Sequence, residues 1–231
     1  ELDNTYFSKF GKTFEDYRLG LELSMEEIEK LDKYCKKINF KWFCSVLDIK
    51  SFYNILDFKP ELIKIPSTVS GHSLLHEEVA KNYKKNVVIS TGYTDKNYQN
   101  YITKTFKKNK KIYLLQCTSS YPTKFEDCNI AVIRNYNQLS KKNNLIIPGY
   151  SSHEPGSIGS IMAIAAGARM LEKHVKFKNV PWSHFDNVAL DLSNNEFKKY
   201  VQEIRKAELL IGSEIKKISP NEHHKYIPTK I

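Results

Sequence analysis

Two histidines near the ends of neighbouring apolar segments are the side chains of this chain best suited to chemistry. His153 follows the apolar run at residues 145–150, and His174 lies at the end of the run at residues 170–175, with a small-residue helix predicted between them at residues 157–166. Neutral imidazole binds borderline divalent metals, and two histidines leave coordination positions for substrate oxygens and water. A lone histidine is more often a structural residue. Two at adjacent strand ends are equally compatible with one shared divalent metal and with structural roles.

The other apolar segments also end in polar side chains. Each of the six ends carries a hydroxyl, an amine or an imidazole, and they lie at residues 44–45, 64–67, 90–92, 117–122, 149–153 and 172–174. A single serine at such a position often only caps a helix or a turn. Six agreeing ends around Lys64 instead predict a cradle for phosphate or carboxylate, because both anions need several donors and a cation.

The elements that position these groups alternate along the chain. Short apolar runs at residues 40–46, 62–66, 86–90, 111–117, 145–150 and 170–175 predict strands. Helices are predicted from Ser24, which forms a capping box with Glu27, and at residues 49–56, 73–83, 96–108, 129–140, 157–166 and 194–210, the last ending at Gly212. Continuous apolar strands followed by helices indicate a parallel sheet covered on both faces.

This alternation predicts an α/β fold of the TIM-barrel type. No G-x-G-x-x-G turn follows any predicted strand, which argues against a dinucleotide-binding sheet. A closed (β/α)8 barrel needs eight strands, and only six are recognisable. Either residues 1–23, whose pattern assigns no element, hold two more strands, or the barrel lacks its first two strands, which we favour. The barrel domain is predicted at residues 24–212, and residues 213–231, with His223 and His224, are a predicted tail or linker.

Composition limits the function classes. The 231 residues carry a formal charge of +10, but the lysines are spread along the chain and no aromatic and basic RNA-binding motif occurs, so we expect a small anionic substrate and no nucleic acid. No apolar run approaches a membrane span, so no membrane association is expected. No leader pattern opens the sequence, which predicts a cytoplasmic protein. The four cysteines have no metal-type spacing and are expected to be reduced.

The strand-end motifs resemble those of the N-acylneuraminate (sialic acid) synthase family, which includes legionaminate and pseudaminate synthases. The resemblance runs from about Gly11 to Gly212, and its signatures are Lys64-Ile65-Pro66-Ser67, Ser90-Thr91-Gly92, Cys117-Thr118-Ser119-Ser120-Tyr121-Pro122, Gly149-Tyr150-Ser151-Ser152-His153 and Gly167-Ala168 followed by Glu172-Lys173-His174. It implies an enzyme that condenses phosphoenolpyruvate with an N-acylated amino sugar, such as N-acetylmannosamine, to a nine-carbon 2-keto sugar acid and phosphate. It also implies a homodimer and a divalent cation, Mn²⁺ by preference, with Mg²⁺ or Co²⁺ as alternatives.

Site roles follow from the same resemblance, motif by motif. It implies that His153 and His174 are the metal ligands and that Tyr121 and Asp186 contact the sugar, with both histidines and Asp186 in the catalytic group. The implied phosphoenolpyruvate shell consists of Ser45, Lys64, Ser67, Ser90, Ser119 and Ser151.

Two positions depart from the family pattern. Ser152 stands where members usually have aspartate, and His184-Phe185-Asp186-Asn187 replaces a usual Gly-x-Asp-His. A first strand with a catalytic glutamate, a second strand with a substrate-binding lysine and a C-terminal antifreeze-like domain are not recognisable. Two alternatives therefore stay open: another phosphoenolpyruvate-dependent aldol-type synthase, and a degenerate member that binds its ligand without turnover.

Overall fold

The structure is a computed structural model that describes residues 8–222, so the predicted tail histidines His223 and His224 lie outside the described residues. The α-helices are α1 (Phe14–Leu21), α2 (Met25–Lys37), α3 (Ile49–Leu56), α4 (Ser73–Asn82), α5 (Lys96–Thr105), α6 (Val132–Lys142), α7 (Ile158–Ala165) and α8 (Glu196–Ile211). The strands are β1 (Cys44–Ser45), β2 (Leu62–Ile65), β3 (Asn86–Ser90), β4 (Lys111–Cys117), β5 (Ile146–Ser152), β6 (Met170–Lys173), β7 (Val175–Lys176) and β8 (Leu190–Asp191).

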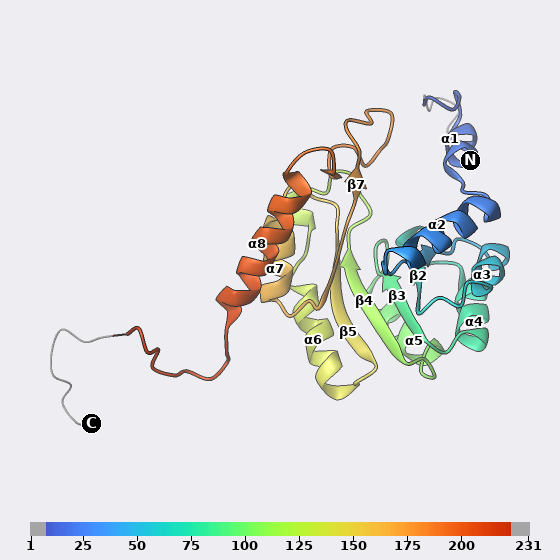
Figure 1. Cartoon of the computed structure of the whole chain (residues 1–231). Helices are drawn as coiled ribbons and strands as arrows, with labels where there is room; N and C mark the ends of the chain where they lie inside the picture. The colour runs from blue at the N-terminus through green and yellow to red at the C-terminus, as the bar shows by residue number, and fades with distance from the viewer. Residues whose placement is uncertain (1–7, 223–231) are drawn as a thin grey trace, which may run out of the picture.

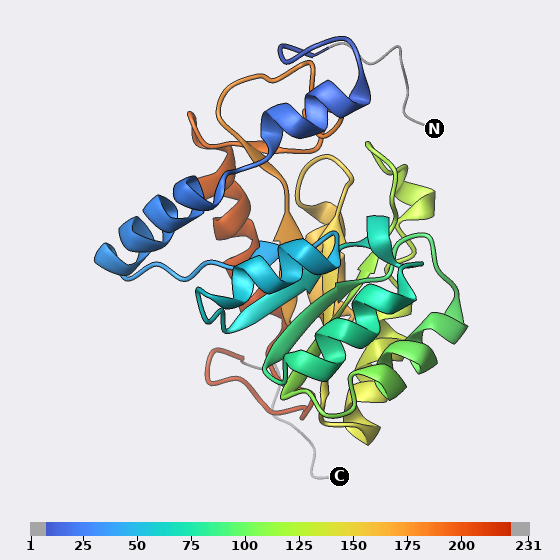
Figure 2. The same ribbon diagram turned by 90° about the vertical axis from the view of Figure 1, so that its right-hand side faces the viewer.

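Six strands form one curled parallel sheet in the order β1-β2-β3-β4-β5-β6, as predicted from the alternating pattern. The helices line the outside of the curl, with α3, α4 and α5 on one flank and α6, α7 and α8 on the other (Figures 1 and 2). The described residues therefore form a six-stranded half-barrel. They do not form the closed (β/α)8 barrel of the predicted TIM-barrel fold.

The core lies between the sheet and its helices. Ile63 and Ile65 of β2 alternate with Lys64, and both isoleucines pack with Phe52 of α3 and Leu75 of α4 in one buried cluster. Because side chains alternate along a strand, this arrangement turns Lys64 to the opposite, inner side of the curl. The register of β2 and β3 places Lys64 beside Val88, so each strand contributes its carboxyl end to the same rim.

The N-terminal segment does not contain the two missing strands within its described part. Residues 8–23 hold helix α1, whose N-cap Thr13 forms a capping box with Asp16. Aromatic rings in α1 and in the segment before it contact the loop that follows β7. Phe10 lies edge-on to Trp182 with ring centroids 5.5 Å apart, and the centroid of Tyr17 in α1 lies 5.9 Å from that of the same indole. The helix therefore lies beside this loop, and the six-stranded half-barrel remains without its first two strands in the described residues.

The predicted strand at residues 170–175 is divided. Met170–Lys173 pairs with β5, whereas Val175 and Lys176 pair with Leu190 and Asp191 of the unpredicted strand β8. His174 lies at the break between the two pairings, and its backbone carbonyl accepts a hydrogen bond from Leu190 N at 2.9 Å. Helix α8 ends at Gly212, with a φ of 58°, as predicted, and residues 213–222 contain no helix or strand.

The buried histidine His76 gives the first testable prediction. It is fully buried among aromatic rings, including Tyr101 and Phe106, and burial lowers its pKa from 6.5 to about 4, against a smaller opposing effect of the Val69 carbonyl. As the pH falls, His76 takes up a proton in the unfolded chain near its ordinary pKa of 6.5, whereas in the folded chain it does so only near pH 4. The free energy of unfolding therefore decreases as the pH falls from about 6.5 to about 4. We expect His76 to reduce the free energy of unfolding by about 2 kcal/mol between pH 7 and pH 5.

Urea unfolding of the wild type and of the His76→Phe variant at both pH values measures this contribution. The variant should show the smaller pH dependence. His72→Gln is the matched control, because His72 caps the same helix α4 with Nδ1 at 3.3 Å from Leu75 N but is only half-buried, so the loss of pH dependence should be larger in His76→Phe than in His72→Gln. An equal pH dependence in wild type and His76→Phe contradicts the prediction.

Candidate active site

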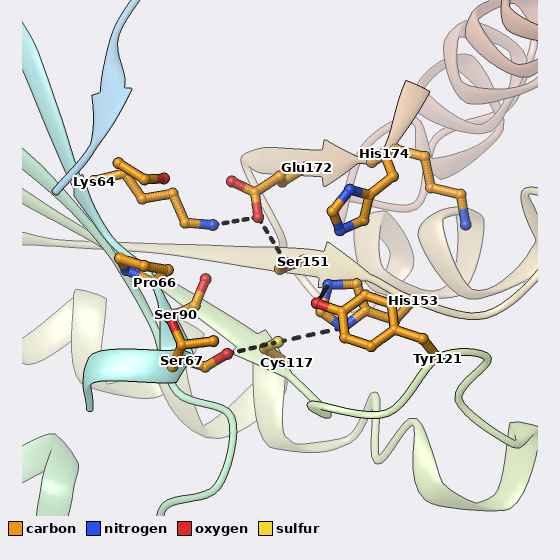
Figure 3. Close-up of a pocket in the computed structure, with 13 residues that line it drawn as sticks. Lys64, Pro66, Ser67, Ser90, Cys117, Tyr121, Ser151, His153, Glu172 and His174 are labelled. Carbon is orange, nitrogen blue, oxygen red and sulfur yellow. Dashed lines mark hydrogen bonds and ion pairs between the residues drawn. The ribbon is translucent and has the colours of Figure 1, made fainter. Parts of the chain in front are cut away.

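A cavity of about 260 Å³ opens at the carboxyl ends of the strands, where the strand-end pattern places the site (Figure 3). It is lined by Ser45, Lys64, Pro66, Ser67, Thr68, Ser90, Cys117, Tyr121, Ser151, His153, Glu172, Lys173 and His174. The structure thus brings together eight of the ten predicted site residues, all except Ser119 and Asp186. The lining combines hydroxyls, one buried lysine and two imidazoles in a single space.

A lysine and a glutamate face each other across this cavity. Lys64 of β2, only 6% exposed, forms an ion pair with Glu172 of β6, and Ser151 of β5 donates a hydrogen bond to the same carboxylate oxygen at 2.7 Å. Burial alone would raise the pKa of Glu172, but the charge and hydrogen bond of Lys64 and the Ser151 bond outweigh it and hold that pKa below its usual value. The cavity therefore holds an ionised pair, and its lysine is available to an entering anion that competes with Glu172.

The two predicted metal-binding histidines lie side by side. Their ring centroids are 5.4 Å apart, with 37° between the ring planes. His153 Nδ1 lies 2.8 Å from the carbonyl oxygen of Thr118, which can only accept, so Nδ1 carries the proton and Nε2 carries the lone pair that can accept a hydrogen bond or bind a metal. The hydroxyl of Tyr121 lies 3.1 Å from Nε2 and donates to it.

Burial keeps both rings uncharged. It lowers the pKa of His153, and it lowers the pKa of His174 to about 4, with His153 as the next contribution. A neutral ring with its second nitrogen fixed by a carbonyl is the form that binds a divalent metal. Among residues 8–222, however, no group of three or more His, Cys, Asp or Glu side chains is arranged to hold a metal. These rings fit a two-histidine site whose other ligands come from substrate or water.

Hydroxyl groups form the opposite wall of the cavity. Ser119 lies at its edge and donates to Ser67 Oγ at 2.8 Å. The hydroxyl of Ser90 is buried and has no hydrogen-bond partner among the described residues, so its donor is free for a ligand. Gly92 lies behind this wall, where an added Cβ would clash with the side chains of Ser119 and Ser67. The close packing there holds the two hydroxyls at the mouth of the cavity.

The two predicted sugar contacts differ in position. The Tyr121 ring packs on His153 with centroids 4.2 Å apart, and burial raises the pKa of its phenol well above the usual value. Asp186 does not line the cavity: its carboxylate accepts from Lys176 Nζ at 2.9 Å and from Val180 N at 2.7 Å. These bonds hold the loop after β7, so a sugar contact by Asp186 stays a prediction.

Two residues of the site region have no predicted role. Glu172 lines the cavity; it lies two positions before His174, and strand alternation places both on one face. The ring of His184 lies edge-on to Tyr121 at 4.8 Å. The position of Glu172 could be found from its two-residue separation from His174. The position of His184 depends on the course of a loop, which no local sequence pattern determines.

The fold and the site together define a barrel-type protein whose polar groups meet at the carboxyl ends of parallel strands, which is where barrel enzymes have their active sites. The NeuB family model matches residues 4–216, and the chain belongs to this family. This confirms the resemblance predicted from the strand-end motifs.

Named relatives and solved structures agree with the family. The chain is 31% identical to mouse N-acetylneuraminate-9-phosphate synthase over 96% of its own length and 61% of the relative, and 30% identical to the N,N'-diacetyllegionaminic acid synthase of Campylobacter jejuni over 87% and 60%. The N-acetylneuraminic acid synthetase of Leptospira borgpetersenii, solved with citrate, superimposes with a TM-score of 0.79 at 25% identity, over 92% of this chain and 73% of that one. The chain therefore spans about three fifths of the length of the curated relatives.

One composition-based expectation, on the cysteines, is also met. Cys35, Cys44, Cys117 and Cys128 are all free, as predicted. Within residues 8–222, no helix has both the length and the apolar character needed to cross a membrane.

Proposed function

We propose that this chain carries the catalytic half-barrel of a sialic-acid-type synthase, which condenses phosphoenolpyruvate with an N-acylated amino sugar and releases phosphate. The single observation that carries the proposal is the shared cavity: Lys64 and the serine hydroxyls provide donors for an anion within the same space as two neutral imidazoles. Phosphoenolpyruvate offers a phosphate and a carboxylate to such donors. Membership of the NeuB family supports the assignment.

The lysine and the serine hydroxyls of the cavity bind the anionic substrate in the proposed reaction. Lys64, Ser67 and Ser90 bind the anionic groups of phosphoenolpyruvate, and Ser119 keeps the Ser67 hydroxyl in place. The fixed donors hold the enol carbon toward the histidine side of the cavity, where the sugar aldehyde enters, so that little reorganisation is needed at the moment of attack.

The histidine side would hold a divalent cation, Mn²⁺ in the first instance, on His153 and His174. When bound, this cation supplies Lewis-acid stabilisation of the negative charge that grows on the aldehyde oxygen. Thr118 keeps the proton of His153 on Nδ1 and so leaves Nε2 as the ligand atom. Burial keeps His174 unprotonated at neutral pH. We include in the proposal a homodimer, which the family resemblance implies.

Two measurements on the 231-residue chain test this function. We expect Mn²⁺ and phosphoenolpyruvate together to raise the melting temperature by about 10 °C at concentrations near 100 times their dissociation constants. We expect phosphate release only after an N-acylhexosamine is added, and comparison of N-acetylmannosamine with 2,4-diacetamido sugars then identifies the sugar class. Stabilisation without phosphate release with any of these sugars indicates a binding protein, and the absence of both effects refutes the proposal.

A further inference from the structure

A buried carboxylate lies directly behind the histidine pair and takes no part in the cavity described above. Glu154 is 0% exposed and follows His153 in the chain. Its Oε2 accepts from Tyr150 Oη at 2.7 Å, and its Oε1 accepts from Ser152 Oγ at 3.0 Å. A buried carboxylate needs such donors, and it also needs a nearby positive charge.

That positive charge is Lys173, which reaches Glu154 through a serine. Lys173 Nζ donates to Ser152 Oγ at 2.8 Å and to the backbone carbonyl of Glu154. A serine hydroxyl has one hydrogen and accepting lone pairs, and an ammonium group can only donate. The hydrogen bonds therefore run in one direction, from the Lys173 ammonium to the Ser152 hydroxyl and from that hydroxyl to the Glu154 carboxylate.

The strand register places this chain of bonds immediately before both candidate metal ligands. Ser152 of β5 is the register partner of Lys173 of β6, and the next residues along the two strands are His153 and His174. A bond across these two strands fixes the point from which both imidazoles leave the sheet. Removing it would loosen the relative position of the two rings.

The surrounding sequence is adapted to the position of the carboxylate. Ser152 and Glu154 lie two residues apart on either side of His153, so the hydroxyl and the carboxylate can meet beside the sheet. Gly159 of α7 faces that carboxylate, and a Cβ added there would clash with it. The room for Glu154 is thus provided by a residue without a side chain.

We propose that Ser152, Glu154 and Lys173 form a serine-bridged ion pair that positions His153 and His174. All three are positioning residues: Ser152 and Glu154 do not line the cavity, and Lys173, which does, donates to Ser152 Oγ and to the Glu154 carbonyl. The inference deepens the proposed function, since it assigns the histidines the role of a metal site, but the ion pair itself does not depend on turnover.

Moving the buried carboxylate from residue 154 to residue 152 tests the proposal. Glu154→Gln removes one charge and Ser152→Asp adds one beside Lys173, so each single variant unbalances the buried charges and should lower the melting temperature by about 5–10 °C. The double variant, Ser152→Asp with Glu154→Gln, restores one carboxylate for one ammonium and should melt within about 2 °C of the wild type. If the double variant loses as much as the two singles combined, the ion pair is refuted.

A second readout follows the histidine position without any metal. The Nδ1 proton of His153, bound to the Thr118 carbonyl, should give a proton NMR resonance that shifts or broadens in Glu154→Gln and returns in the double variant. The affinity for Mn²⁺ should fall by about 10–100-fold in Glu154→Gln and recover in the double variant. An unchanged resonance and an unchanged affinity in Glu154→Gln refute the positioning role.

A matched control separates this effect from general loss of stability. Asp32→Asn also removes a buried carboxylate with a lysine partner, because Asp32 accepts from Lys36 Nζ at 2.6 Å and from Trp42 Nε1 at 3.2 Å. It should lower the melting temperature but leave the His153 resonance and the Mn²⁺ affinity unchanged. If the wild type binds no Mn²⁺ while the double variant still restores the melting temperature and the resonance, the ion pair stands and the proposed function falls.

Discussion

Replacing His174 by glutamine is expected to weaken Mn²⁺ binding by at least about 100-fold and to slow phosphate release by on the order of 10³-fold, because in the proposed function the change removes one of the two proposed ligand atoms and with it the charge stabilisation at the aldehyde oxygen. His174 is held in place by stacking on Phe185, with centroids 5.0 Å apart and ring planes 7° apart, and by its position at the end of β6. Glutamine keeps a polar side chain of similar length, so we expect only a small change in the free energy of unfolding.

Calorimetric titration with Mn²⁺ and a phosphate-release assay measure the two effects. His72→Gln is the matched control, since this histidine caps α4 and does not line the cavity. Its Mn²⁺ affinity and rate should equal those of the wild type. Retention of both quantities within about threefold in His174→Gln would show that the imidazole is not a ligand, since loss of a metal ligand costs far more than that.

The parts of the fold that sequence predicted are those with a local physical cause. The strand at Asn86–Ser90 is a run of β-branched residues, and the helix at Met25–Lys37 begins with the Ser24 and Glu27 capping box, so both elements follow from short-range patterns. The apolar run at residues 170–175 did not separate β7 from β6, and β8 escaped prediction, because the pairing of β7 with β8 joins segments more than ten positions apart. Helix α1 had a capping signal at Thr13, but its position depends on aromatic contacts with Trp182.

The site divides in the same way. Parallel strands bring their carboxyl ends to one rim, so Lys64, Ser90 and His153 could be placed together from strand ends alone. The position of Asp186 could not, because it lies in the loop after β7, where Lys176 and the Val180 amide bind its carboxylate. A motif match names a residue in such a loop but does not fix where its side chain points.

The second large effect is expected at Lys64. Lys64→Met removes the only lysine among the predicted anion-binding residues and should weaken phosphoenolpyruvate binding by on the order of 100-fold, as loss of about 3 kcal/mol from charge-assisted hydrogen bonds implies. The same change leaves Glu172 without its cation. Since about a third of the Glu172 side chain is exposed, we expect a loss of only about 2 kcal/mol in the free energy of unfolding.

A second variant separates binding from stability. Lys64→Met combined with Glu172→Gln removes both charges of the pair, and the amide can still accept the hydrogen bond that Ser151 donates. We expect this double variant to regain most of the lost stability in urea unfolding, because no uncompensated charge remains in the cavity. It should still fail to show the rise in melting temperature that phosphoenolpyruvate gives the wild type. Recovery of phosphoenolpyruvate binding in the double variant would mean that Lys64 serves only to neutralise Glu172, and the anion cradle would then have to be sought among the hydroxyls alone.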